Sequence, residues 1–225
     1  MNIQSVVKTR RASDKWKPKT AWLYLFTIAL SVVLLGVFAA VVRIDVRRLD
    51  IRNPNVPGIL GLLNSLITPV IALIFSRVRT VKDFQDSFAM IPVTRQRVAF
   101  AAVIGFLIQA VSLYVFEGGW KHLRLRTSFD YDALSALLAP FLEEPTGRGF
   151  LYAAFRKGYS VTASTVLVTA VELLNHAPFT FTSTQWFVLI VSFSVSTCIL
   201  REKTGSLWPP IVCHLALNAI PAATQ

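Results

Sequence analysis

Charged residues are scarce in this sequence, and acidic residues are the scarcest of them. Only 16% of the 225 residues are charged and 54% are hydrophobic, whereas a soluble domain has roughly 25% charged residues. Cysteine occurs only twice, as Cys198 and Cys213, and both lie inside apolar runs. These shortages exclude a soluble globular domain and a disulfide framework, so we expect both cysteines to be buried as small hydrophobic residues.

Long apolar runs take the place of the missing charge. Four of them reach the roughly 17 to 25 residues of a membrane span, and three later ones are shorter. The longer runs are 22–42, 56–75, 98–116 and 133–155, and the shorter runs are 161–174, 186–200 and 207–220. Each shorter run either borrows flanking residues or ends inside a protein cavity. The pattern predicts an all-α, polytopic membrane bundle of six to eight helices.

The domain organisation is simple, because no internal repeat and no insertion of domain size is visible. We expect a basic N-terminal tail over residues 1–21 and one membrane domain over 22–225. The first apolar run exceeds the roughly 7 to 15 residues of a signal-peptide core and lacks a small-residue cleavage site, so it is interpreted as a retained signal anchor. The oligomeric state stays open.

The positive charge is best explained by membrane topology. The chain has 23 Lys and Arg against 12 Asp and Glu, but they fall in the tail and the connecting loops rather than along one face, which argues against a nucleic-acid partner. The bias of these residues between alternate loops favours a cytoplasmic N-terminus. We therefore expect an integral protein of the cell (plasma) membrane whose loop charges are solvated or touch lipid headgroups.

Three ionisable residues interrupt one of the longer runs. Glu143, Glu144 and Arg148 lie in ALLAPFLEEPTGRGFLYAAF, although a charge at the middle of a spanning helix costs about 2.5 to 3.5 kcal/mol. On a helix Glu144 and Arg148 are four apart and suited to an ion pair, while Glu143 points about 100° away. The alternatives are a buried tie between helices and a functional site, and the second carboxylate favours the site.

Two more polar pairs lie in the later runs, each again four residues apart. Glu172 and His176 end the fifth run shortly before a proline, and His214 and Asn218 lie within the last run. Viewed alone, the first pair suits a contact at a helix end and the second suits polar packing between helices. The remaining histidine, His122, belongs to a basic loop and is interpreted as a surface residue.

Together these side chains contain the groups needed to hydrolyse an amide. A carboxylate or imidazole can take a proton from water, while a second imidazole and a carboxamide can hydrogen-bond the developing oxyanion. No serine or cysteine nucleophile is required.

The ordered set EExxxR, a helical His and then HxxxN resembles the CPBP superfamily, which comprises type II CAAX prenyl endopeptidases and bacterial relatives linked to bacteriocin processing and immunity. The resemblance covers roughly residues 133–222. It implies that Glu143 activates water together with His176, that His214 and Asn218 form the oxyanion site, and that Arg148 holds Glu144. It also implies a polar, water-filled cavity between the motif helices, a substrate that is a membrane-associated or lipidated protein or peptide, and cleavage without a metal or other cofactor.

Two positions depart from the family's pattern. Glu172 stands where the family commonly has Phe, and it either bonds to Asn175 or a headgroup or alters proton transfer at His176. Pro145 and Gly147 replace bulky apolar residues, so we expect the helix to kink or to begin near Glu144.

Other functions stay open at this point. Two histidines and several carboxylates could ligate zinc in a metalloprotease, although no HExxH occurs. A non-catalytic immunity or scaffold protein could retain the same motifs, and a transporter could use the acids and histidines as a proton relay, although no broken helices repeat in two halves. The identity of the substrate, its prenylation and the side to which the site opens do not follow from the sequence.

Overall fold

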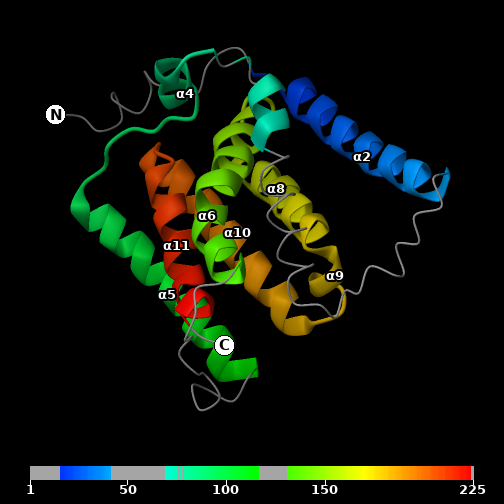
Figure 1. Ribbon diagram of the computed structural model, residues 1–225. Helices are drawn as coiled ribbons and strands as arrows, with labels where there is room; N and C mark the ends of the chain where they lie inside the picture. Colours follow the sequence, from blue (N-terminus) through cyan, green and yellow to red (C-terminus); the bar gives the residue numbers. More distant parts are fainter. Residues whose placement is uncertain (1–15, 42–68, 76, 78, 117–130, 224–225) are drawn as a thin grey trace.

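The computed structural model describes residues 16–41, 69–75, 77, 79–116 and 131–223, and every regular element within these ranges is a helix (Figure 1). The predicted all-α class is therefore confirmed. In chain order the elements are α2 (Pro18–Val41), α4 (Val81–Ser87), α5 (Arg95–Phe116), α6 (Tyr131–Glu144), the π-helix η3 (Pro145–Leu151), α7 (Tyr152–Phe155), α8 (Val161–Asn175), α9 (Ala177–Thr180), α10 (Thr184–Thr204) and α11 (Trp208–Ala223).

Some of the predicted features fall outside the described part of the chain. Of the run 56–75 only residues 69–75 are described, and they are helical. Most of the basic tail and His122 lie outside the described residues. The structured region begins before residue 22, since Trp16 is buried and α2 begins at Pro18.

One of the three shorter apolar runs reaches spanning length by borrowing flanking residues. The run 186–200 becomes the 21-residue helix α10, which extends into the polar residues on both sides, whereas α8 and α11 have 15 and 16 residues. Among the described residues, α5 and α10 are the two helices that are long and apolar enough to cross a membrane. One consequence is a correction: Arg201, expected in a solvated loop, lies within α10 and is buried.

The helices begin and end at residues that satisfy their free backbone groups. The Ser160 hydroxyl accepts a hydrogen bond from the Ala163 N–H at the start of α8, and Ser183 does the same for Trp186 at the start of α10. Gly205 ends α10 in the left-handed conformation, with φ 67°, which a glycine adopts without strain.

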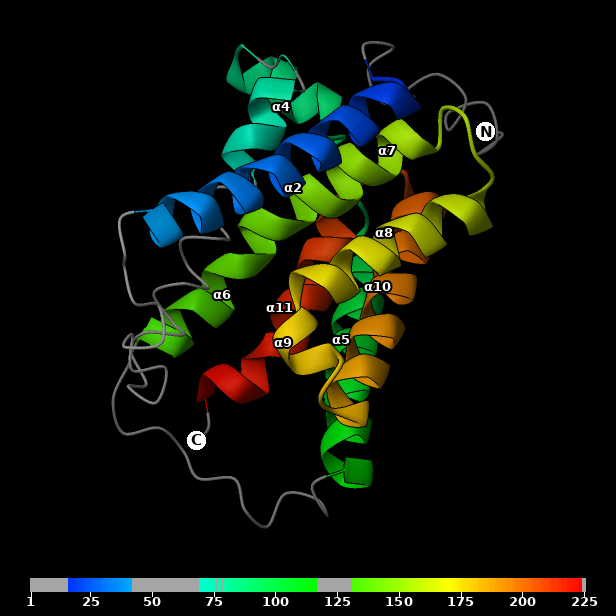
Figure 2. The same ribbon diagram turned by 90° about the vertical axis from the view of Figure 1, so that its right-hand side faces the viewer.

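Helix α11 lies at the centre of the bundle and packs against α5, α6 and α10 (Figures 1 and 2). The approach of α5 is close because Gly105 has no side chain: a Cβ there would overlap the carbonyl oxygen of Cys213. Both cysteines are buried free thiols, as predicted. Helix α8 packs against α10, so the segments that carry the three polar motifs all adjoin α10 or α11.

An aromatic cluster joins α2 to the other side of the bundle. The Trp16 ring makes edge contacts with Phe88 and Phe150, each at a centroid distance of 5.2 Å, and Tyr24 contacts Phe150 at 5.4 Å. Figure 2 shows α2 running across α7, and the contact of Tyr24 with Phe150 joins α2 to the π-helix. The segment that bears Arg148 is therefore enclosed on both sides, by α2 and by α10.

The outer faces of the helices carry large apolar side chains. On α5 the most exposed of these are Tyr114, Phe100 and Val115, with 73%, 63% and 60% of their surface accessible. A continuous apolar surface of this kind is unfavourable in water and suits the acyl chains of a bilayer. It agrees with an integral membrane protein.

Candidate active site

A π-helix carries the first motif through the centre of the protein. Pro145 has no N–H to donate, and from this residue the α-helical ladder gives way to the seven-residue segment η3. The expected kink thus takes the form of a π segment, and the chain stays helical on both sides of it. All seven residues of η3 are buried. Short π segments of this kind recur at functional sites.

Arg148 holds two carboxylates inside this segment. Its Nη1 lies 3.4 Å from Glu144 Oε1, which is the ion pair expected from the spacing, and it also makes a short contact with Glu172 Oε1. The side chains of Glu144 and Arg148 are wholly buried, and that of Glu172 is 9% exposed. Gly147 permits the approach of α8, since a Cβ there would lie 3.2 Å from Glu172 Oε1. Of the two alternatives for Glu172, the structure gives neither a bond to Asn175 nor a test of proton transfer at His176; it pairs this carboxylate with Arg148.

His214 joins the same cluster from α11. Its Nδ1 lies 3.0 Å from Glu144 Oε1. Because a carboxylate accepts hydrogen bonds, this nitrogen is the donor, and Nε2 is the ring nitrogen that remains for another partner. Glu144 therefore receives hydrogen bonds from Arg148 and from His214 at one oxygen, while its Oε2 has no partner among the described residues.

The Phe193 ring supports both of these basic groups. The guanidinium carbon of Arg148 lies 5.1 Å from the ring centroid, and the His214 ring lies 4.5 Å from it at an interplanar angle of 57°. Contact with the face of an aromatic ring favours a cation. The backbone of the arginine is fixed as well, because Arg201 Nε donates to the Arg148 carbonyl oxygen at 3.3 Å.

Asn218 lies one turn after His214 and ties α11 to α6. Its side-chain Nδ2 donates to the Ala136 carbonyl oxygen at 2.9 Å. This bond settles the orientation of the amide, because only the NH₂ group can donate to a carbonyl. Polar packing between helices, one of the two interpretations of this motif, thus describes the local geometry of Asn218.

His176 lies at the end of α8, where it is the C-cap residue. Its backbone N–H and its ring Nδ1 both lie near the Glu172 carbonyl oxygen, at 3.1 and 3.0 Å. A carbonyl only accepts, so Nδ1 carries a proton, and in a neutral imidazole with this tautomer the lone pair lies on Nε2. The helix-end contact considered for this histidine is thus present, and the ring is only partly buried.

Glu143 and Glu144 differ sharply in burial although they are adjacent. Glu144 is wholly buried in the ion cluster, whereas Glu143 is of intermediate exposure. This agrees with the division expected from the 100° rotation per residue.

The structure brings the three motifs together around Arg148 and Glu144. Glu172 of the second motif contacts Arg148 of the first, and His214 Nδ1 of the third lies 3.0 Å from Glu144 Oε1. Sequence reasoning missed the support that Phe193 provides and the bond from Arg201. No signal marks the phenylalanine, since it is one apolar residue in an apolar run. Among the described residues, no three His, Cys, Asp or Glu side chains form a group suited to a metal ion.

The C-terminal part of the chain matches a known family. Residues 131–220 match the model of a family described as "Type II CAAX prenyl endopeptidase Rce1-like". This segment includes the EExxxR set and both motif histidines, in agreement with the resemblance stated above. No curated protein and no solved structure matches the chain.

Proposed function

Because residues 131–220 match the model of the Rce1-like family of type II CAAX prenyl endopeptidases, we propose that this integral membrane protein is a glutamate-type intramembrane endopeptidase. It hydrolyses a peptide bond in a membrane-associated or lipidated protein or peptide. No metal takes part, and no nucleic acid is a partner. The protein acts in the cell membrane with its N-terminus in the cytoplasm.

The observation that carries the proposal is the unequal burial of the two adjacent carboxylates. Glu144 is wholly buried with Arg148, while the adjacent Glu143 is partly exposed. A general base must be reachable by water and substrate. Glu143 therefore suits the base and Glu144 suits the support, as the family resemblance implies.

His176 complements Glu143 in the proposed first step. Its Nε2 lone pair, fixed by the bond from Nδ1 to the Glu172 carbonyl, can accept a proton. Glu143 and His176 remove one proton from water as its oxygen adds to the carbonyl carbon of the scissile bond. The resulting oxyanion accepts hydrogen bonds from His214 Nε2 and the Asn218 amide, and the proton then passes to the leaving amine as the C–N bond breaks.

The test is cleavage of quenched peptides, prenylated and unprenylated, by purified protein in nanodiscs. Glu143→Gln should abolish chelator-resistant cleavage and leave the fold intact. The matched control is Glu202→Gln. It removes a carboxylate that pairs with Arg156, at an N–O distance of 3.1 Å, and that is not part of the ion cluster. General acid–base catalysis contributes about 10²- to 10⁴-fold, so the control should differ from wild type by far less.

Three outcomes distinguish the alternatives. Full activity of Glu143→Gln would refute the glutamate mechanism. Loss of wild-type activity on chelation would favour a metalloprotease, and a well-folded wild type that cuts no peptide but retains a binding partner would favour the non-catalytic immunity or scaffold protein. Dependence of cleavage on the prenyl group would define the substrate class.

A further inference from the structure

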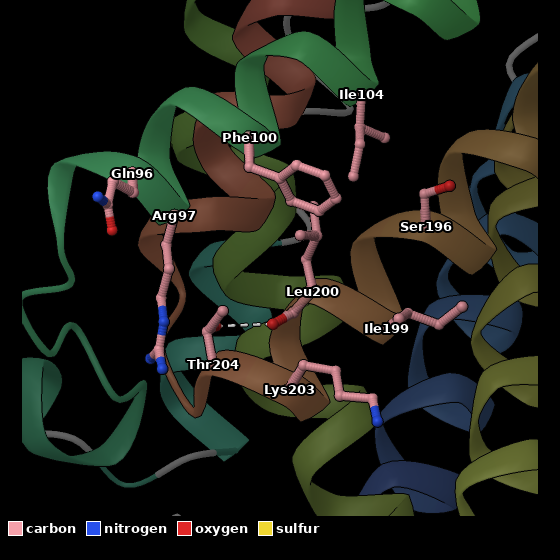
Figure 3. A pocket seen from close by; sticks show the side chains of 9 residues that line it. All are labelled: Gln96, Arg97, Phe100, Ile104, Ser196, Ile199, Leu200, Lys203 and Thr204. Carbon is pink, nitrogen blue, oxygen red and sulfur yellow. Dashed lines mark hydrogen bonds between the residues drawn. The ribbon is translucent and has the colours of Figure 1, made fainter.

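A second site lies away from the ion cluster, in a groove between the two helices that are suited to cross the membrane. The groove has a volume of about 570 Å³ and is formed by the start of α5 and the last turns of α10. This size lies within the roughly 300 to 1,000 Å³ of small-molecule sites. Its lining residues are Gln96, Arg97, Phe100, Ile104, Ser196, Ile199, Leu200, Lys203 and Thr204 (Figure 3).

The groove is divided into a charged end and an apolar end. Figure 3 shows Arg97 and Lys203 extending toward one end, whereas Phe100 and Ile104 lie toward the other. The lining residues include two cations and no carboxylate. The structure gives neither cation an ion pair with any other residue that it describes.

The charged end coincides with the ends of the two spans. Arg97 lies in the first turn of α5 and Lys203 in the last turn of α10, both exposed. In a bilayer these levels meet the headgroups, while Phe100 and Ile104 lie deeper along the same helix. Each Lys or Arg near the headgroups raises the affinity for an anionic lipid roughly fivefold.

We propose that this groove binds one anionic phospholipid, with the phosphate between Arg97 and Lys203 and an acyl chain along Phe100, Ile104 and Ile199. The two cations at one end and the apolar side chains at the other both suit an amphiphile with a negative head. Phe100 and Ile199 have 63% and 48% of their surface exposed, and an acyl chain covers such residues. The site goes beyond the proposed peptidase function and does not depend on it.

The experiment compares lipid binding to the full-length protein by native mass spectrometry and by the thermal unfolding midpoint. The probes are dioleoyl phosphatidylglycerol and, as the neutral match, dioleoyl phosphatidylcholine. We expect phosphatidylglycerol to bind as one tightly held molecule and to raise the midpoint. The double variant Arg97→Gln/Lys203→Gln should weaken that binding by roughly thirtyfold.

Matched variants separate the groove from general charge and hydrophobicity. Lys82→Gln removes an exposed cation on α4 outside the groove and should leave binding unchanged. Phe100→Ala should weaken binding several-fold, whereas Phe106→Ala, on the same helix but outside the groove, should not. All these positions are exposed or partly exposed, so the variants should fold, and their midpoints in phosphatidylcholine check this.

Several outcomes would overturn the proposal. Equal binding of the two lipids, or equal weakening by Lys82→Gln and by the double variant, would show nonspecific attraction. Inorganic phosphate that displaces the lipid at comparable concentration would show a site for free anions instead. If the double variant weakens the binding of a prenylated peptide and leaves phosphatidylglycerol binding intact, the groove is a substrate site instead. Catalytic variants such as Glu143→Gln should retain lipid binding, so this test stands apart from that of the peptidase function.

Discussion

The strongest energetic prediction concerns Arg148, which pairs with two carboxylates where none of the three side chains has appreciable contact with solvent. Arg148→Met keeps much of the volume and removes the charge. Loss of one partner of a buried ion pair costs about 3 to 5 kcal/mol, because the other charge is left uncompensated. We expect this variant to fall in that range, and Glu172→Gln to cost about 1 to 3 kcal/mol, since Arg148 then still pairs with Glu144.

The contact itself is measured by a double-mutant cycle. If Arg148 and Glu172 interact directly, the double variant loses less free energy of unfolding than the two single variants lose in sum. The difference should be about 0.5 to 3 kcal/mol. The chain offers its own reporter, because both of its cysteines, Cys198 and Cys213, are fully buried free thiols. A thiol-reactive dye will therefore label the protein only as it unfolds.

The control for this cycle is Arg156→Met. The pair of Arg156 with Glu202 has side chains that are 29% and 33% exposed, so solvent screens it and its loss should cost no more than about 1 kcal/mol. In soluble domains of this size each kcal/mol shifts the midpoint by about 2 to 4 °C. Additive single costs, or an effect of Arg148→Met no larger than that of the control, would refute the buried cluster.

Three further outcomes are expected. Gly105→Ala should lower the free energy of unfolding by about 1 to 3 kcal/mol, as overpacking typically does, because its Cβ would overlap the Cys213 carbonyl oxygen. An unchanged unfolding midpoint would mean that α5 and α11 lie farther apart. Asn218→Asp replaces a donor that faces a backbone carbonyl with an acceptor, so it should cost about 1 to 3 kcal/mol in the same assay, and a neutral result would contradict that bond. His176→Gln should reduce peptide cleavage more than His214→Gln, because glutamine can still donate an N–H but is no base; equal losses would contradict separate roles.

The helices themselves followed well from the sequence, since span length and apolar composition are local properties. The π-helix did not, although Pro145 marked its position. A proline indicates that a backbone bond is lost, but whether the ladder breaks, kinks or shifts by one residue depends on the surrounding packing. Here Gly147 and Gly149 allow Glu172 and Phe88 to lie against the segment, which a bulky residue would prevent.

The pairing within the site was predicted only where it is local. Glu144 and Arg148 are four residues apart, so helix geometry alone brings them together. The contact between Arg148 and Glu172 spans 24 positions and depends on how α8 lies against the π-helix, which no periodicity encodes. Helix packing explains Arg201 as well. Its charge suggested a solvated loop, but it lies in α10, and its side chain donates to the Arg148 carbonyl oxygen.

The two histidines of the site differ in the group that accepts a hydrogen bond from the ring, and this difference suits them to different roles. Both rings are held at Nδ1, His176 by a neutral carbonyl and His214 by the Glu144 carboxylate. A neutral ring leaves a lone pair at Nε2, which suits the base proposed for His176, whereas a donor to an oxyanion needs N–H at that atom. In the cluster itself, Nδ1 of His214 is occupied by its hydrogen bond to Glu144 Oε1. Nε2 is therefore the ring nitrogen of His214 that can face the oxyanion of the proposed reaction.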